Sequence, residues 1–261
     1  MPEPGANTED AQIVDLDNLH ITVLGRAEVL PEAVRLLAQQ GQPPPSLAGV
    51  PLVVEEPLRV GVNDASSTFG TGSVEEDNRF SVSDVAVKDI HLSLAVGVEQ
   101  EGFARSSTII FDTAFTGSRP RTDVINAQVW ALPMAFHDAL TRAVGDETLR
   151  TLTGGQLRTL QQAGFVLGRV VDAQGQPVAG ARVRLDRDEL AHRIYYPSED
   201  LSQVGQEGTS ATGLFLYVHS GGDLETFHMS VEGMDAYMWR NAGAMAGNGL
   251  VLTLYPGTRA P

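Results

Sequence analysis

The chain has 261 residues, of which 42% are hydrophobic, a length that suits two domains of about 100 residues each with connections. Its formal net charge of -15 argues against nucleic acid and anionic membrane surfaces as partners. It contains no cysteine, which excludes disulfides, thiolate nucleophiles and cysteine metal sites.

Residues 1–12 are polar, with neither the basic nor the apolar region of a signal peptide, and we predict a flexible tail there. No apolar run in the sequence is long enough to span a bilayer. The tether that remains when a lipoprotein signal is trimmed has the same polar composition. Membrane contact is therefore expected only through a lipid anchor absent from this chain, and a cytoplasmic location stays open.

A first β-sandwich is predicted over residues 13–115, because many short strand-like segments follow one another there at close spacing. A helical insertion is expected at 31–41, where Pro31 opens and Gly41 closes a run of helix-forming residues. The proline run at 43–45 then predicts an extended segment that leads the chain back to the next strand, near 50–54. The predicted strands lie near 19–24, 50–54, 58–62, 79–82, 90–96 and 107–111.

Residues 116–164 predict a helical connector. Between Met134 and Val144 the apolar residues recur at helical spacing, and further short helices are expected at 147–152 and 156–163. The leucines of these segments are too numerous for a loose linker. We therefore expect the helices to pack on one or both sandwiches.

Residues 165–256 predict a second β-sandwich, followed by a tail at 257–261. Its most regular stretch is Gly168 to Asp186, in which a β-branched run, a turn around Gly175 and an alternating apolar run follow one another. This order predicts a hairpin of two strands. The strands of this half are predicted near 166–171, 181–185, 214–219, 227–231, 236–239 and 250–254.

The stretch reads G-x-V-x-D-x-x-G-x-P-V-x-G-A-x-V-x-L, and this pattern resembles the carboxypeptidase regulatory-like domain, a transthyretin-like β-sandwich. The resemblance implies a mainly β chain of two transthyretin-like or Ig-like sandwiches joined by a short helical segment. Such domains occur in exported bacterial proteins and lipoproteins, which implies a periplasmic or outer-surface location. It also implies a non-enzymatic binding or structural module that presents its faces to a protein or glycan partner.

The landmarks of the second half recur in the first half in the same order, which indicates a tandem repeat. Each shared landmark is a strand start, a turn or a core segment. The matched segments are Val166–Val170 with Val23–Ala27, Val178–Val183 with Ser46–Leu52, Thr209–Phe215 with Val74–Phe80, and His228–Val231 with His91–Leu94.

One candidate binding site lies on the predicted strand 236–239. Tyr237 and Trp239 alternate there with their neighbours, and with Arg240 they could form an aromatic platform for a sugar or peptide. A carbohydrate-binding module would present its partner site in this way. The alternative interpretation is that both aromatic residues belong to the core face of the strand.

A second candidate site would hold a metal near one end of the second sandwich. His219, His228 and Asp223 offer imidazole and carboxylate ligands suited to zinc or iron. Alternation predicts that His228 and Ser230 face outward, and solvated surface histidines have the same pattern. The acidic turn at 75–78 is the place where calcium would bind, although a solvated hairpin tip has the same composition.

A metal-dependent enzyme is the alternative reading. Intradiol dioxygenases resemble the second half and bind ferric iron through tyrosines and a His-x-His pair. Here the matching place reads Thr226-Phe-His228, which lacks the first histidine, while phenolates would come from Tyr195, Tyr196 or Tyr217. No complete catalytic motif is present, so we expect no enzyme activity and no cofactor.

Overall fold

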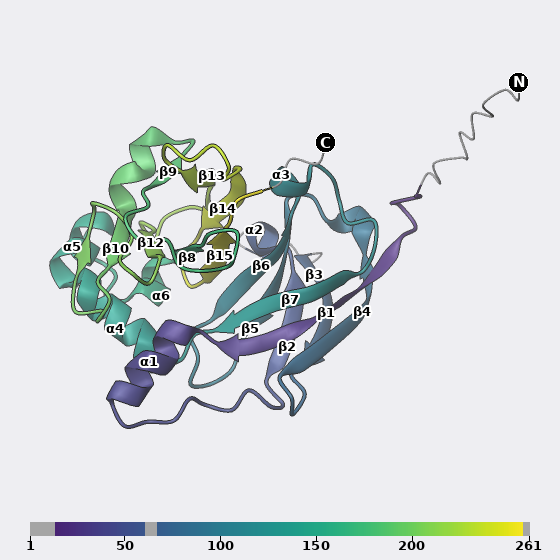
Figure 1. Ribbon diagram of the computed structural model, residues 1–261, viewed down its shortest axis with the longest axis horizontal. Coiled ribbons are helices and arrows are strands. Elements are labelled where there is room, and N and C mark those ends of the chain that lie inside the picture. The colour runs from purple at the N-terminus through teal and green to yellow at the C-terminus, as the bar shows by residue number, and fades with distance from the viewer. Residues whose placement is uncertain (1–13, 61–66, 258–261) are drawn as a thin grey trace, which may run out of the picture.

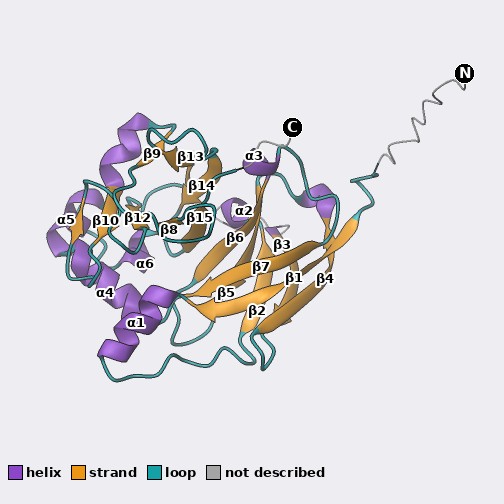
Figure 2. Ribbon diagram, in the orientation of Figure 1, coloured by secondary structure: helices purple, strands orange, loops and turns teal. Residues whose placement is uncertain are grey.

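The computed structural model describes residues 14–60 and 67–257. The predicted tail 1–12 and the last residues, 258–261, lie outside this range. The chain is mainly β, as predicted, and Figure 2 shows strands in both halves with helices concentrated around one of them.

The first half is a sandwich of a three-stranded sheet on four strands of a larger one. The small sheet has the order β4-β1-β7, with β1 antiparallel to β4 and parallel to β7. The facing strands have the order β6-β5-β2-β3 and are antiparallel. The strands are β1 (His20–Val29), β2 (Pro51–Glu55), β3 (Thr68–Ser73), β4 (Arg79–Ala86), β5 (Ser93–Val98), β6 (Ser106–Asp112) and β7 (Val124–Ala131).

The second half is a sandwich of the same kind. Five strands in the order β11-β10-β12-β8-β15 face a three-stranded sheet in the order β14-β13-β9. The strands are β8 (Phe165–Val170), β9 (Val183–Leu185), β10 (Ile194–Pro197), β11 (Val204–Gly205), β12 (Leu214–Val218), β13 (Glu225–Val231), β14 (Arg240–Ala244) and β15 (Gly249–Leu254).

The two halves have the same central topology. β12-β8-β15 repeats the order and the strand directions of β4-β1-β7, and β14-β13-β9 repeats those of β6-β5-β2. Register agrees as well, because Gly25 lies opposite Phe80 and Gly168 lies opposite Phe215. These four residues belong to the segments that the sequence matches to each other.

One continuous sheet joins the halves (Figure 1). β15 pairs in parallel with β6 over three residue pairs, from Gly249 with Ser106 to Val251 with Thr108, which makes a nine-stranded sheet. Each sandwich keeps its own apolar core, since alternate residues of its strands point between its sheets.

Helices fill the outer side of the second half. A third core cluster contains apolar residues of α1, α4, α5 and α6, which pack against the outward residues of β8 and β12. The predicted packing of these helices on a sandwich is therefore confirmed. None of the helices within residues 14–60 and 67–257 has the length and apolarity needed to cross a membrane. The α-helices are α1 (Pro31–Gln39), α2 (Pro57–Val60), α3 (Thr113–Thr116), α4 (Met134–Val144), α5 (Asp146–Leu152) and α6 (Leu160–Ala163), with 3-10 helices η2 (Val87–Asp89) and η3 (Asp188–Arg193).

The predicted hairpin at 168–186 is wrong in one respect. Its turn forms as expected, with the Asp172 carboxylate accepting from the backbone of Gln174 and Gln176 and Gly175 at φ 77°. An antiparallel bridge joins Val171 to Pro177 beside the turn, but β8 and β9 do not pair with each other, because β9 pairs with β13 in the facing sheet. The chain crosses between sheets near Gly180, which has φ 72°.

Three other predicted elements differ from the structure. The segment 116–164 contains strand β7 besides its helices, because the alternating residues of 124–131 continue the small sheet along β1. Residues 57–60 form α2 in place of a strand, and 61–62 lie outside the described residues. Residues 236–239 form no strand, and β14 begins at Arg240. The domain boundaries themselves stay a prediction.

Candidate functional site

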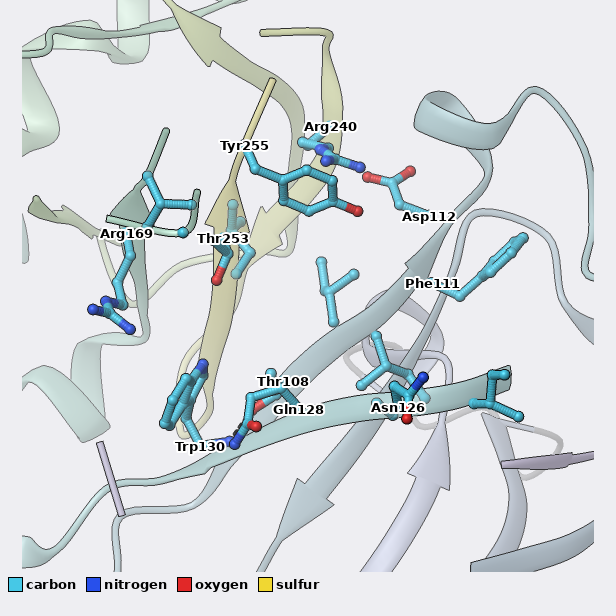
Figure 3. Close-up of a pocket in the computed structure, with 17 residues that line it drawn as sticks. Thr108, Phe111, Asp112, Asn126, Gln128, Trp130, Arg169, Arg240, Thr253 and Tyr255 are labelled. Carbon is cyan, nitrogen blue, oxygen red and sulfur yellow. Dashed lines mark hydrogen bonds between the residues drawn. The ribbon is translucent and has the colours of Figure 1, made fainter. Parts of the chain in front are cut away.

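A groove of about 380 Å³ opens on the seam between the two sandwiches (Figure 3). Strands of both halves line it, with β6 and β7 from the first and β8, β14 and β15 from the second. At one end Arg240, Tyr255 and Asp112 gather, while Trp130 and Gln128 extend from β7 at the other. Its volume lies within the range of small-ligand pockets in proteins.

The floor of the groove forms where β6 separates from β15. Their ladder ends at Thr108 with Val251, although β6 continues to Asp112 and β15 to Leu254. The register of β6 against β5 shifts at Ile110, and such a bulge bends its strand. The bend accounts for the divergence of the two strands just beyond Thr108.

Strand β7 forms one wall of the groove, and like β6 it is irregular where it lines the groove. Asn126 has φ 59°, and the register of β7 against β1 shifts beside it. Ile125 is 65% exposed at the rim. At the Trp130 end of the groove, the backbone N–H of Trp130 donates to Thr108 Oγ1 at 3.0 Å, which ties the wall to the floor.

Arg169 enters the groove from β8 and is held by partners from the first half. Its guanidinium lies 5.6 Å from the centre of the Trp130 ring, a cation–π contact, and its Nη2 is 3.5 Å from Oε1 of the buried Glu32 on α1. Its Nε makes no hydrogen bond within the described part of the chain.

Arg240, at the start of β14, is only 5% exposed. Its guanidinium lies 3.3 Å from the ring centre of Phe115 and 4.1 Å from that of Tyr255. Within residues 14–60 and 67–257 its Nε and Nη2 make no hydrogen bond and it forms no salt bridge, although the charge of Asp112 at the same end of the groove favours its charged form. Burial lowers the pKa of Arg240, because removal from water disfavours the charged form.

Asp112 closes the same end of the groove by binding the second half. Its carboxylate accepts bonds from Asn241 N at 2.9 Å and Asn241 Nδ2 at 2.8 Å, and it caps α3 through Ala114 N at 2.9 Å. Burial raises the pKa of Asp112, while these hydrogen bonds and Arg240 oppose that rise. We call the pair Asp112 and Asn241 the clasp, because it joins β6 to β14.

The residues predicted for the aromatic platform, Tyr237, Trp239 and Arg240, do not form one surface in the structure. Tyr237 is buried, donates to the Val171 carbonyl at 2.9 Å and packs in the second core, as the core interpretation predicts. Trp239 is half-buried, with Arg184 4.7 Å from its ring centre. Only Arg240 of the three lines the groove.

The predicted metal ligands are not brought together. His219 is fully buried, with Nδ1 2.9 Å from the Ala163 carbonyl and Nε2 2.9 Å from the carbonyl of Asp223. His228 is exposed and its Nδ1 lies 2.6 Å from Asp186, whereas Ser230, expected to face outward, is buried. In the part of the chain that the structure describes, no group of three histidine or acidic side chains has metal-binding geometry.

The tyrosines considered for iron have other partners. Tyr217 is buried and donates to Glu225 at 2.6 Å, while Arg193 Nη1 donates to both oxygens of the same carboxylate. Burial and the contact with Glu225 raise the pKa of Tyr217 far above its ordinary value. Tyr196 accepts from the Val183 backbone at 2.8 Å. Burial raises the pKa of Tyr196, although the Val183 N–H opposes that rise. Both phenols are therefore held neutral, whereas a ferric ligand set would need phenolates.

The sequence reasoning missed most of the groove. Arg169 belongs to a repeated segment, and no sequence pattern around it indicated contact with Trp130, which is far away in the sequence. Asp112 and Asn241 are also far apart in sequence. Only the alternation of apolar residues at 124–131 could have revealed the wall formed by β7.

Comparison with known proteins leaves the family of this chain open. No protein-family model and no curated protein matches it. Solved structures with some likeness include a streptococcal ancillary pilin, at 14% identity over 92% of this chain and 69% of the other, with a TM-score of 0.26. The Bacillus anthracis TIE protein has 8% identity over 91% of this chain and 33% of its own, with a TM-score of 0.23.

A shaft pilin, SpaA of Lactobacillus rhamnosus GG, has 8% identity over 93% of this chain and all of its own, with a TM-score of 0.24. Scores this low support no conclusion about the fold or function of the present chain. Its sandwich architecture therefore rests on its own strand pairing and cores.

Proposed function

We propose that this chain is a non-enzymatic binding module of an exported or surface-associated bacterial protein, built from two transthyretin-like sandwiches in tandem. The repeated strand order and the matching positions of Gly25 and Gly168 support the tandem arrangement. The motif from Gly168 to Asp186 supports the carboxypeptidase regulatory-like family.

The observation that carries the binding role is the groove on the seam. Residues from both halves line it, and a buried arginine at its end has no acidic partner within salt-bridge distance in the described residues. A buried guanidinium without a salt bridge costs free energy of folding that its contacts with Phe115 and Tyr255 only partly offset, so its presence in a groove favours a role in binding. We propose no reaction and no resident cofactor, because the groove holds no arrangement that favours either.

The proposal is tested by photo-crosslinking from the groove rim. A benzophenone amino acid at Ile125, the exposed rim residue, should form an adduct with the partner in the producing cell. Leu24 on β1 is 37% exposed and does not line the groove, so the same probe there is the control. Equal adducts at both positions, or no adduct at Ile125, would contradict a binding role for the groove.

A further inference from the structure

Two free strand edges face each other across the groove. Beyond Thr108 and Val251 the structure pairs β6 only with β5, and β15 only with β8, so residues 109–112 and 252–254 have no strand partner on the groove side within the described chain. Backbone N–H and C=O groups along such edges are the recognition surface for an added extended segment.

The positive charge of Arg240 at one end of the groove points to an acidic ligand. Arg240 has no carboxylate within salt-bridge distance in the part of the chain described, and Arg169 lines the same groove. The whole chain carries a net charge of -15, so a groove with a buried Arg240 at one end contrasts with the rest of the protein. The partly buried Arg169 in the same groove is paired with Glu32. Tyr255, which is 42% exposed, covers one side of the Arg240 guanidinium at the groove.

We propose that the groove binds an extended acidic peptide, which adds as a strand beside β6 and β15 and sets a carboxylate against Arg240. This inference rests on the proposed binding role and names the class of partner. The backbone edges would supply affinity regardless of sequence, and the arginine would supply the preference for Asp, Glu or a terminal carboxylate.

A peptide fits the groove better than a glycan. Sugars in binding modules pack on open aromatic faces, and here Trp130 and Tyr255 each have a face taken by a guanidinium, from Arg169 and Arg240 respectively. The unpaired strand edges, in contrast, suit main-chain hydrogen bonds along an extended chain.

The test is a selection of random linear peptides displayed on phage, carried out on the full chain. Enriched peptides should contain an acidic residue among alternating β-forming residues. Replacing that carboxylate with its amide in a synthetic peptide should weaken binding about tenfold or more, as should Arg240→Gln in the protein. Arg184→Gln, which removes the same charge from an exposed site beside Trp239, should leave binding unchanged.

Hydrogen exchange provides the second readout and does not depend on a variant folding. On peptide binding, the backbone amides of residues 109–112 and 252–254 should become protected. Protection elsewhere, enriched peptides without acidic residues, or a selection that yields no binder would each overturn the inference. If oligogalacturonate binds and protects the groove in place of a peptide, the acidic-peptide inference fails while the binding role survives.

Discussion

Gly25 lies where β1 and β7 come so close that only hydrogen fits between them. A Cβ on this residue would meet the Ala127 carbonyl, which belongs to the backbone of the paired strand and cannot rotate away. Gly168, its counterpart in the second half, leaves room for the ring of Phe215. Both glycines are therefore required by packing, and neither has a positive φ.

Gly25→Ala should lower the free energy of unfolding by about 1–3 kcal/mol, because the added methyl group forces β1 and β7 apart. Chemical denaturation with an unchanged m-value would measure this loss. Gly205→Ala on β11 is the control, since nothing lies near its Cβ position and we expect a change within about 0.5 kcal/mol. Equal stability of the two variants would show that the close approach at Gly25 is absent in solution.

Glu55 is a buried carboxyl that accepts a hydrogen bond from Ser107, and burial raises its pKa above 4.5. A raised pKa in the folded state means that stability from this group is fully present below 4.5 and is lost as pH rises through the folded pKa. Glu55→Gln cannot titrate and keeps an oxygen for Ser107. The variant should be more stable than the wild type at neutral pH.

The measurement for Glu55→Gln is the thermal midpoint of both proteins as a function of pH. The advantage of the variant should shrink on acidification and vanish below the unfolded-state pKa. Exposed Glu76→Gln in the acidic turn is the matched control. A constant difference between variant and wild type at every pH would contradict the raised pKa.

At the scale of elements, the divergence of β6 from β15 creates the groove and the clasp closes it. Three hydrogen bonds hold the Asp112 carboxylate, and two of them come from Asn241 on β14. The Asn241 amide also donates to the Leu92 carbonyl at 2.8 Å. The clasp thus fixes the second half against β6 and against Leu92, the residue that precedes β5.

Asn241→Asp should destabilise the protein by about 3 kcal/mol at neutral pH, because it sets two buried carboxylates against each other. Protonation relieves the repulsion, so much of the loss should be recovered at acidic pH. Denaturant unfolding at several pH values would measure both effects. Asn126→Asp, an exposed change on β7, should have little effect, and a similar loss in both variants would argue against the clasp.

At the scale of the whole molecule, the nine-stranded sheet makes the two sandwiches depend on each other. Separation would expose the facing edges of β6 and β15 and the buried Asp112 of the clasp. Exposed strand edges promote aggregation, so each half expressed alone is expected to aggregate.

We predict that the full chain unfolds in one cooperative transition. Calorimetry should give a van't Hoff enthalpy equal to the calorimetric enthalpy, with near-ultraviolet and far-ultraviolet circular dichroism changing together. Asn241→Asp, which weakens the clasp, is the informative comparison, because it should bring the two halves closer to independent unfolding. Two separate transitions in the wild type would show that the shared sheet does not couple the halves.

The sequence alone determined the local features of this protein. Alternation of apolar residues indicated most of the strands, proline and glycine marked the ends of α1, and the turn at Asp172 followed from its own residues. Repeated segments also predicted that Gly25 and Gly168 occupy matching places. The strands, helix ends and turn depend on neighbours within a few residues, and the repeat depends only on comparing one segment with another, so the sequence records both directly.

Tertiary structure decided which strands pair and what their edges enclose. The turn after β8 suggested a hairpin, but the second strand joins the facing sheet, because cores formed by distant strands outweigh local turn geometry. The bulge at Ile110, the pairing of β15 with β6 and the burial of Arg240 beside Phe115 all come from residues far apart in the chain. The groove exists only where those distant contacts meet, and no local pattern contains it.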